Sequence, residues 1–221
     1  MKNVLPLAIL MFVMVLPVFS MTTSAQELKP IRLLPPETDG GCPLMQALKQ
    51  RKSSRMFSTE KLPMQVLSNL LWAAFGVNRQ ESGKRTAPSA MNWQEIDIYI
   101  STADGLYVYD ASAHTLKPLL AEDIRAMTGY QQFVGEAPVN LIYVADFSRM
   151  GQATDDEKTF YSAAATGFIS QNVYLFCASQ GLGTVVRGSV NREATVKALK
   201  LSGKKKVILA QTVGYPGANA E

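Results

Sequence analysis

The chain has 221 residues, of which 47% are hydrophobic and 18% are charged. These proportions are typical of a globular domain with a good core, and one domain is the default at this length. Two cysteines are far fewer than a disulfide scaffold needs. With one histidine and two distant cysteines, the sequence offers no zinc site and no Ser-His or Cys-His nucleophile.

The first 25 residues have the layout of a secretory signal peptide. Lys2 precedes an apolar run over residues 4–19, and the small residues Thr23, Ser24 and Ala25 follow that run. The run is shorter than the ~20 residues that a membrane-spanning helix needs, and two prolines interrupt it. We therefore predict cleavage after Ala25 and no stable membrane anchor in the mature protein.

Cleavage after Ala25 removes one lysine and no acid, which leaves 21 basic and 18 acidic side chains and a net charge of +3. That charge is too mild to indicate nucleic acid as a partner. The signal predicts an exported protein, either periplasmic or extracellular. Because the signal lacks paired arginines, we expect the chain to cross the membrane unfolded and to acquire any cofactor after export.

The predicted elements begin after a segment rich in proline and glycine. Residues 26–41 are predicted to form an irregular N-terminal arm, and the folded domain to occupy residues 42–221. Apolar residues spaced three and four apart predict helices over 42–50 and 63–76. Residues 77–92 are predicted to form a polar loop, whose unusual length favours a functional role.

The rest of the chain alternates strand and helix patterns. Residues 95–102 alternate apolar and polar side chains, and Asp104-Gly105 is a hairpin-turn dipeptide before a strand over 106–109. The other predicted strands are 139–145, 184–186 and 207–213, and the other predicted helices are 118–127, 155–180 and 191–201. Together these elements predict an α+β fold.

Three shorter patterns bear on function. Gly181-Leu182-Gly183 follows a helix and precedes a strand, which is the reverse of a dinucleotide loop, so it does not indicate a Rossmann site. The small residues 163–167 allow close helix approach, either at a subunit interface or in the core. Cys42 and Cys177 could pair in an oxidising compartment, although the apolar helical setting of Cys177 is more typical of a small core residue.

The sequence Arg51-Lys52-Ser53-Ser54-Arg55 carries the strongest functional pattern. In an extended segment, positions 51, 53 and 55 point to one side, whereas on a helix Ser53 would face away from both arginines. Two guanidinium forks and one short hydroxyl donor suit the oxygens of a small, multiply anionic ligand. The alternative is a solvated charge run after a helix.

Several segments, taken in order, resemble the nitroreductase-like flavoprotein family, and within it the branch that includes azoline-oxidising dehydrogenases. The resemblance covers residues 42–216 and rests on residues 51–57 (RKSSRMF), 85–92 (RTAPSAMN) with Gln94, Gln171-Asn172, 181–188 (GLGTVVRG) and 213–216 (VGYP). The order and spacing of these segments argue against chance. The resemblance implies a central, mainly antiparallel sheet flanked by helices, in an intertwined homodimer.

The resemblance further implies FMN, bound noncovalently in a groove between the two subunits. Arg51 and Ser53 match the positions that bind phosphate and ribityl oxygens, with Lys52 nearby as a point charge. Arg55 matches the position beside the pyrimidine edge, where a cation stabilises the negative charge that develops at N1 and O2 on reduction.

Two other segments match family positions around the flavin ring. The second subunit is implied to place Pro88, Ser89, Ala90 and Met91 against the isoalloxazine, with Asn92 at its O4 or N3 edge. Val186, Arg187 and Gly188 match the segment whose backbone N–H points at N5. The resemblance therefore implies that no protein side chain acts as a nucleophile.

The implied activity is FMN-dependent hydride or electron transfer through flavin N5 to an aromatic or quinone-like acceptor, with NAD(P)H as the usual donor. The alternatives are an exported flavin-binding or storage protein without turnover, and oxidation of a peptide azoline. The family usually has a Lys or Arg after the terminal Gly-Tyr-Pro, and none follows Pro216 here. Either Lys204 to Lys206 or Arg85 completes the phosphate site, or FMN binds more weakly.

Overall fold

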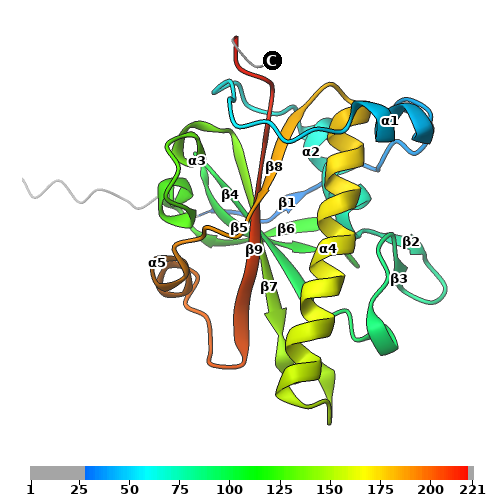
Figure 1. The fold of residues 1–221 in the computed structure, drawn as a ribbon, viewed down its shortest axis with the longest axis vertical. Coiled ribbons are helices and arrows are strands. Elements are labelled where there is room, and N and C mark those ends of the chain that lie inside the picture. Colours follow the sequence, from blue (N-terminus) through cyan, green and yellow to red (C-terminus); the bar gives the residue numbers. More distant parts are fainter. Residues whose placement is uncertain (1–27, 219–221) are drawn as a thin grey trace, which may run out of the picture.

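The computed structural model describes residues 28–218, and the predicted signal peptide lies outside them. Its centre is a seven-stranded sheet in the order β1-β6-β5-β4-β7-β9-β8, in which all neighbouring strands are antiparallel (Figure 1). The strands are β1 (Ile31–Arg32), β4 (Ile96–Thr102), β5 (Gly105–Asp110), β6 (Thr115–Leu120), β7 (Val139–Asp146), β8 (Gly183–Arg187) and β9 (Lys205–Gly214). The predicted α+β fold with a central antiparallel sheet is confirmed.

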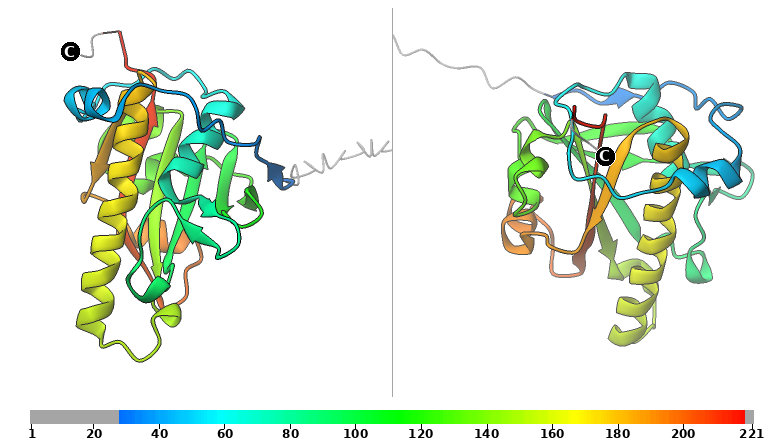
Figure 2. Two further views of the ribbon diagram at one scale, coloured as in Figure 1. Left: turned by 90° about the vertical axis from the view of Figure 1, so that its right-hand side faces the viewer. Right: turned by 45° about the horizontal axis from the view of Figure 1, so that its top comes forward.

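Helices cover both faces of this sheet. On one face, α2 (Met64–Phe75) packs against the long helix α4 (Asp155–Ser179), and α1 (Leu44–Gln50) lies beside α4 (Figures 1 and 2). On the other side lie the short helices α3 (Phe133–Glu136) and α5 (Arg192–Ala198). The predicted helices over 42–50, 63–76 and 191–201 are confirmed, each with slightly shorter bounds.

Strand β7 lies between β4 and β9, and its side chains are apolar and buried on both faces of the sheet. Leu141 and Tyr143 belong to the main core beneath α2 and α4, whereas Ile142 and Val144 belong to a smaller core on the opposite face. All four side chains are fully buried. Successive strand residues point to opposite faces, so the unbroken apolar run predicted a strand covered on both sides.

Helix α4 is the longest helix among residues 28–218. It begins with a capping box, in which the side chains of Thr154 and Glu157 each accept a hydrogen bond from the other's backbone N–H. It ends before Gly181, whose φ of +68° favours glycine. Its 25 residues span about 38 Å at 1.5 Å per residue. Cys177 on this helix is buried in the main core, and Cys42 and Cys177 are both free.

The predicted helix over residues 118–127 is wrong. Residues 115–120 form β6 instead, and only Arg125–Thr128 is helical, as a single 3-10 turn. Pro118 is compatible with this strand because β1 pairs only with Thr115 and Leu116, which leaves the rest of that edge open. Pairing with β5 along most of β6 outweighs the helical spacing of the local sequence.

Two segments that lack a strong periodic pattern also contain short strands. In the N-terminal arm, Ile31–Arg32 forms β1, whose partner β6 lies far along the chain. In the segment 77–92, β2 (Val77–Arg79) and β3 (Lys84–Arg85) form a small hairpin, followed by a 3-10 turn over Ala90–Asn92. Among the helices of residues 28–218, none has both the length and the apolar composition needed to cross a membrane.

Candidate functional site

Residues 51–58, here called the strap, cross the end of the sheet in an extended conformation. The backbone N–H of Ser54 donates to the carbonyl of Thr184 at 2.9 Å, beside the edge strand β8. The N–H of Ser58 donates to the carbonyl of Tyr215, also at 2.9 Å, and Gly217 donates to Met56 at 3.1 Å. The strap is therefore fixed between β8 and the segment that follows β9.

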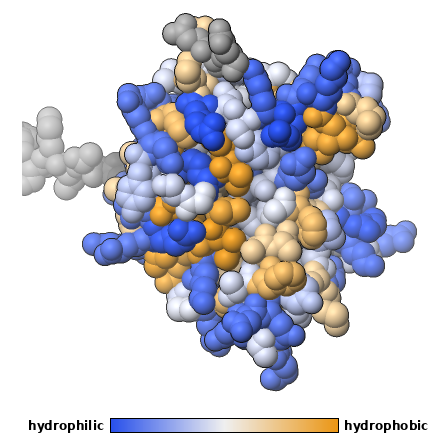
Figure 3. All heavy atoms as spheres, in the orientation of Figure 1, coloured by the Kyte–Doolittle hydropathy of each residue, from blue (hydrophilic) through white to orange (hydrophobic). Residues whose placement is uncertain are grey.

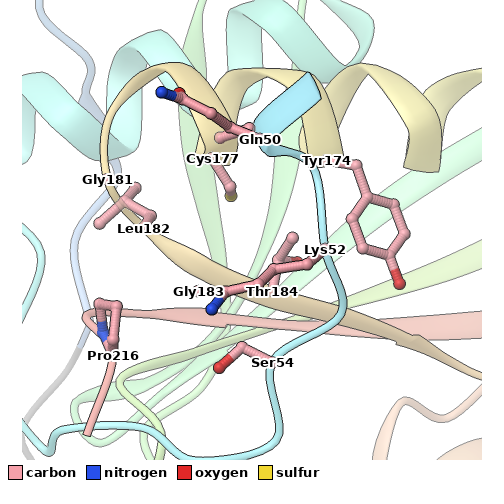
Figure 4. A pocket seen from close by; sticks show the side chains of 11 residues that line it. Gln50, Lys52, Ser54, Tyr174, Cys177, Gly181, Leu182, Gly183, Thr184 and Pro216 are labelled. Atoms are coloured by element: carbon pink, nitrogen blue, oxygen red, sulfur yellow. The ribbon is translucent and has the colours of Figure 1, made fainter. Parts of the chain in front are cut away.

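The two sides of the strap face different surroundings, as the alternation of residues 51–55 predicted. Lys52 and Ser54 line a cavity of about 330 Å³ between the strap, the end of α4 and the start of β8 (Figure 4). Arg51 and Ser53 instead both contact Tyr174, which also borders that cavity. Arg55 is exposed and makes no side-chain hydrogen bond or ion pair with residues 28–218.

Tyr174 on α4 joins the strap to β8, a role that the sequence did not reveal. Its hydroxyl lies 2.9 Å from the Ser53 hydroxyl and accepts the backbone N–H of Val186 at 3.0 Å. The Arg51 guanidinium lies over its ring, 5.4 Å from the centroid. A single tyrosine in a long helix carries no signal that could have indicated these contacts.

At the end of β8, the side chain of Arg187 points into the protein rather than toward a ligand. Its guanidinium donates to Thr212 Oγ1, to the carbonyl of Thr128 and to Asn140 Oδ1, each at 3.1 Å. The residue is 4% exposed, and burial lowers the pKa of Arg187 to about 10. At this end of β8, the exposed Gly188, and not the Arg187 side chain, is therefore open to a ligand.

Residues 88–94 form a compact loop with a strained backbone. Met91, Asn92 and Gln94 all have positive φ, at 51°, 56° and 49°, and non-glycine residues seldom occupy this left-handed region. The Ser89 hydroxyl holds the loop, since it donates to Glu95 Oε2 and accepts the N–H of Gln94, both at 2.8 Å. The loop leaves Met91 84% exposed, as a residue that contacts a ligand or a second subunit would be.

Within one chain, the strap and this loop lie far apart along α4. The Trp93 ring packs edge-on against Tyr161, near the start of the helix, with 5.7 Å between ring centroids. The strap contacts Tyr174, which follows Tyr161 by about 20 Å along the axis at 1.5 Å per residue. The structure therefore brings Arg51, Ser53 and Val186 together but does not add residues 88–92 to them.

Neither of the proposed replacements for a basic residue after Pro216, the lysines 204–206 or Arg85, lies beside the strap of the same chain. Lys205 begins β9, and the strap contacts the segment after its other end, about 30 Å away at 3.3 Å per residue. Lys205 is also paired with Asp97 at 2.9 Å. Arg85 is engaged elsewhere, because it donates to Gln94 Oε1 at 2.7 Å and to the carbonyl of Phe75.

Comparisons with known proteins agree with this arrangement. A provisionally named nitroreductase of Methanocaldococcus jannaschii is 32% identical over 181 residues, which cover 77% of this chain and 90% of that protein. A solved structure of a provisionally named nitroreductase from Ralstonia eutropha is 44% identical, with a TM-score of 0.83, and the match covers 89% of this chain and 92% of that one.

A third similarity concerns the fold alone. A provisionally named nitroreductase from Desulfovibrio desulfuricans, solved in complex with FMN, is 23% identical with a TM-score of 0.59, over 81% of this chain and 90% of that one. The model of the Nitroreductase family itself matches residues 48–215. The chain therefore belongs to the nitroreductase family.

Proposed function

We propose that the protein is an FMN-dependent oxidoreductase that passes a hydride or electrons from a donor to an aromatic or quinone-like acceptor. The observation that carries this proposal is the convergence of Arg51, Ser53 and the backbone of Val186 on one side chain, Tyr174. Family membership supports an oxidoreductase in general. The relative solved with FMN supports the choice of cofactor.

The chemistry of the site residues fits FMN. Arg51 and Ser53 offer charged and neutral donors to the phosphate end, and both are held by Tyr174. Arg55 is exposed and unpaired among residues 28–218, so its charge is free to stabilise a reduced flavin ring. A side chain at Gly188 would meet only Leu209, at 3.9 Å, so the backbone there is accessible to a planar ring. FMN itself, when bound, supplies the group that accepts and releases the hydride.

A complete site requires a second subunit in this proposal. The strap and the loop 88–94 lie about 20 Å apart along α4 of one chain, and a two-fold partner is the simplest way to bring one of each together. The outer surface of α4 is suited to such a partner because Phe160 and Phe168 are 67% and 50% exposed. Ala163 and Gly167 lie on the same exposed surface.

Helix α1 extends this apolar surface. Leu44 and Met45 are 62% and 75% exposed, and α1 packs beside α4. In the space-filling view, apolar residues gather over both helices (Figure 3). We propose that this surface is the homodimer interface. Replacement of Phe168 by Asp is then expected to yield a monomer in light scattering, and a Phe168→Asp protein that stays dimeric would contradict the assignment.

The primary test is spectroscopic. We expect the purified mature protein, loaded with FMN, to show a flavin spectrum that bleaches on anaerobic titration with NADH or NADPH. Steady-state turnover of a nitroaromatic compound or a quinone would then establish the acceptor class. If the bound flavin stayed oxidised with every donor, including dithionite, the oxidoreductase proposal would be refuted. Reversible flavin binding without any turnover would favour the storage alternative.

Export is a separate part of the proposal. Nicotinamide cofactors are scarce outside the cytoplasm, so an exported enzyme would need a donor from that compartment. We propose that the mature chain begins at Gln26, as the sequence motif after residue 19 predicts. Mass spectrometry of the N-terminus from a cell fractionation tests this directly, and an intact Met1 on the native protein would refute it.

A further inference from the structure

We propose that Tyr174 is a positioning residue, which fixes the direction of the Ser53 hydroxyl hydrogen and makes Ser53 a dedicated donor to a phosphate oxygen. This inference rests on the proposed FMN function and deepens it. It assigns to one tyrosine on α4 the selection of the phosphorylated cofactor over its dephosphorylated form.

The direction of the hydrogen bonds follows from the three groups that meet. The backbone N–H of Val186 can only donate, and it donates to the Tyr174 hydroxyl oxygen at 3.0 Å. The only other polar atom that hydrogen-bonds to this hydroxyl, among residues 28–218, is Ser53 Oγ at 2.9 Å. The tyrosine proton therefore has one acceptor, Ser53 Oγ, and the chain of bonds runs from Val186 through Tyr174 to Ser53.

The opposite direction would leave the tyrosine proton without an acceptor among residues 28–218. Tyr174 is 7% exposed and borders the cavity, so its proton could then turn only toward the cavity and not to a protein acceptor among residues 28–218. Losing that protein acceptor costs a hydrogen bond, so the direction from Tyr174 to Ser53 is favoured. Ser53 by contrast is exposed, so its own proton is free to point away from Tyr174 and toward a ligand.

The consequence is a pair of side chains that both present hydrogen-bond donors to a ligand. Arg51 has no acceptor atom, and its guanidinium is held over the same tyrosine ring. Ser53, with its oxygen already accepting from Tyr174, offers the ligand its hydrogen. Phosphate oxygens only accept at neutral pH, whereas a ribityl hydroxyl must also place its own proton. The arrangement therefore favours phosphate at this position, and successive bonds in the chain strengthen one another.

The test compares FMN with riboflavin, which lacks the phosphate. Dissociation constants for both are measured by flavin fluorescence on the refolded, flavin-free mature protein and on Tyr174→Phe, Ser53→Ala and the double variant. Tyr109→Phe serves as the matched control, since Tyr109 is a buried tyrosine whose hydroxyl bonds to His114, away from the strap. Thermal melting shows that each variant is folded.

We expect Tyr174→Phe to raise the dissociation constant for FMN by about five- to tenfold, the size of one ordinary hydrogen bond, and to change that for riboflavin by less than about twofold. In the Ser53→Ala background, Tyr174→Phe should have little further effect, because the group that it orients is gone. Equal weakening of FMN and riboflavin, or independent, additive effects of the two changes, would overturn the inference.

Two other outcomes, a variant that fails to fold and a protein that binds no flavin, are distinguished from a lost preference for FMN. If Tyr174→Phe fails to fold, Ser53→Ala tests whether Ser53 is a donor directed at the phosphate, because Ser53 is exposed. Equal losses of riboflavin affinity and FMN affinity in Ser53→Ala would again contradict a phosphate-directed donor. If the unaltered protein binds neither flavin, the proposed function itself fails, which is a different result from a lost preference between the two ligands.

Discussion

Asn140 Oδ1 and the Arg187 guanidinium are joined by a buried hydrogen bond of 3.1 Å that links β7 to β8 across β9. Thr212 on β9 bonds to both residues, at 2.7 Å to Asn140 and 3.1 Å to Arg187. Arg187 thus completes a closed polar group in the interior, and its side chain is a structural element of the sheet. Arg187 therefore has a structural role, whereas Arg51 lies at the candidate site, although both belong to segments that resemble cofactor-binding positions.

The first prediction is that substitution of Arg187 affects stability, whereas substitution of Arg51 affects FMN binding. Arg187→Ala should lower the free energy of unfolding by about 2–4 kcal/mol, because it leaves a cavity and buried acceptors without their donor. Arg51→Ala should lose FMN while its unfolding free energy falls by no more than about 1 kcal/mol, the size of its cation–π contact with Tyr174. Chemical denaturation of the flavin-free proteins and FMN titration measure the two effects.

The two arginine variants serve as controls for each other. An Arg187→Ala protein that unfolds like the unaltered protein but no longer binds FMN would place the guanidinium in the site, contrary to its contacts. A similar comparison applies to Arg55→Ala, which should keep part of its FMN affinity and lower the flavin reduction potential. Equal flavin retention by the Arg51 and Arg55 variants would refute the division of roles between them.

The second prediction tests whether one FMN site takes residues from two chains. Arg51→Ala and Asn92→Gly homodimers should each bind FMN poorly. Glycine suits position 92 because the native φ is 56°, so this change removes the amide without straining the backbone. After the two variants are mixed, unfolded and refolded together, each mixed dimer should contain one intact site, and FMN binding should partly return.

If each site were made within one chain, mixing would restore nothing, because every chain would still carry a defective site. Mixing Arg51→Ala with itself is the matched control and should give no recovery. Binding is measured by equilibrium dialysis at fixed total protein. The observation behind this prediction is the separation of the strap contact at Tyr174 from the loop contact at Tyr161 on one helix.

How far the sequence predicts this structure depends on whether a pattern is local. The alternation in residues 51–55 is local, and the structure places Arg51 and Ser53 on one tyrosine and Lys52 and Ser54 on a cavity. The partner, Tyr174, was not predictable, because it depends on how α4 is rotated against β8. The same limit applies to Arg187: both faces of the sheet are covered, so strand alternation alone does not show that this side chain points inward.

The error at residues 118–127 has a related cause. The spacing of Leu119, Leu120 and Ile124 is compatible with a helix, and proline is common in the first turn of one. The strand forms because β5 is already in place to pair with it, which is a non-local interaction that no window of the sequence contains. The arrangement of the candidate site was predictable where its residues are contiguous in the sequence, and not where it depends on tertiary contacts.

The third prediction concerns the loop 88–94 and its support. Glu95 is fully buried; Ser89 donates to its Oε2, and its Oε1 has no partner among residues 28–218. Ser89→Ala removes this donor together with the acceptor of the Gln94 N–H. We expect a loss of about 1–3 kcal/mol in unfolding free energy, together with faster proteolysis at the exposed Met91.

The matched control for this change is Ser112→Ala, since Ser112 is exposed and its hydroxyl makes no hydrogen bond within residues 28–218. That variant should match the unaltered protein within about 0.5 kcal/mol. A Ser89→Ala protein as stable as the control would show that the hydroxyl does not hold the loop. In that case the left-handed conformations of Met91, Asn92 and Gln94 must be maintained by the Arg85 and Arg149 contacts to Gln94 instead.

The fourth prediction concerns His114, the only histidine in the chain. Its ring bonds to Tyr109 through Nδ1 at 2.9 Å and to Ser68 through Nε2 at 2.7 Å, and Nε2 also lies 3.0 Å from the carbonyl of Leu34. These contacts attach the N-terminal arm to α2 and β5. Burial is the main cause that lowers the pKa of His114 below 6.5, and the Leu34 carbonyl opposes it only in part.

The sign of the pH effect follows from this direction. The unfolded chain binds a proton at His114 with the ordinary pKa of 6.5, whereas the folded protein binds it only at lower pH. Stability therefore falls as the pH drops below about 6.5, down to the folded pKa. Hydrogen bonds and nearby cations lower the carboxyl pKa values of Asp110 and Asp123. At Asp146, burial raises the pKa, and the Ser148 hydrogen bonds with Lys205 and Arg149 together outweigh it and lower the pKa. The stabilising contributions of these three carboxylates are therefore lost only below the ordinary aspartate pKa of about 4.

We therefore expect the melting temperature of the unaltered protein to fall between about pH 7 and pH 5, and the fall to be smaller in His114→Gln. Glutamine retains a polar group near Ser68 and Leu34 but does not titrate, so it separates protonation from simple loss of contact. NMR of the single imidazole gives the folded pKa independently. An identical fall in both proteins, or a folded pKa at or above 6.5, would show that His114 does not couple pH to the attachment of the arm.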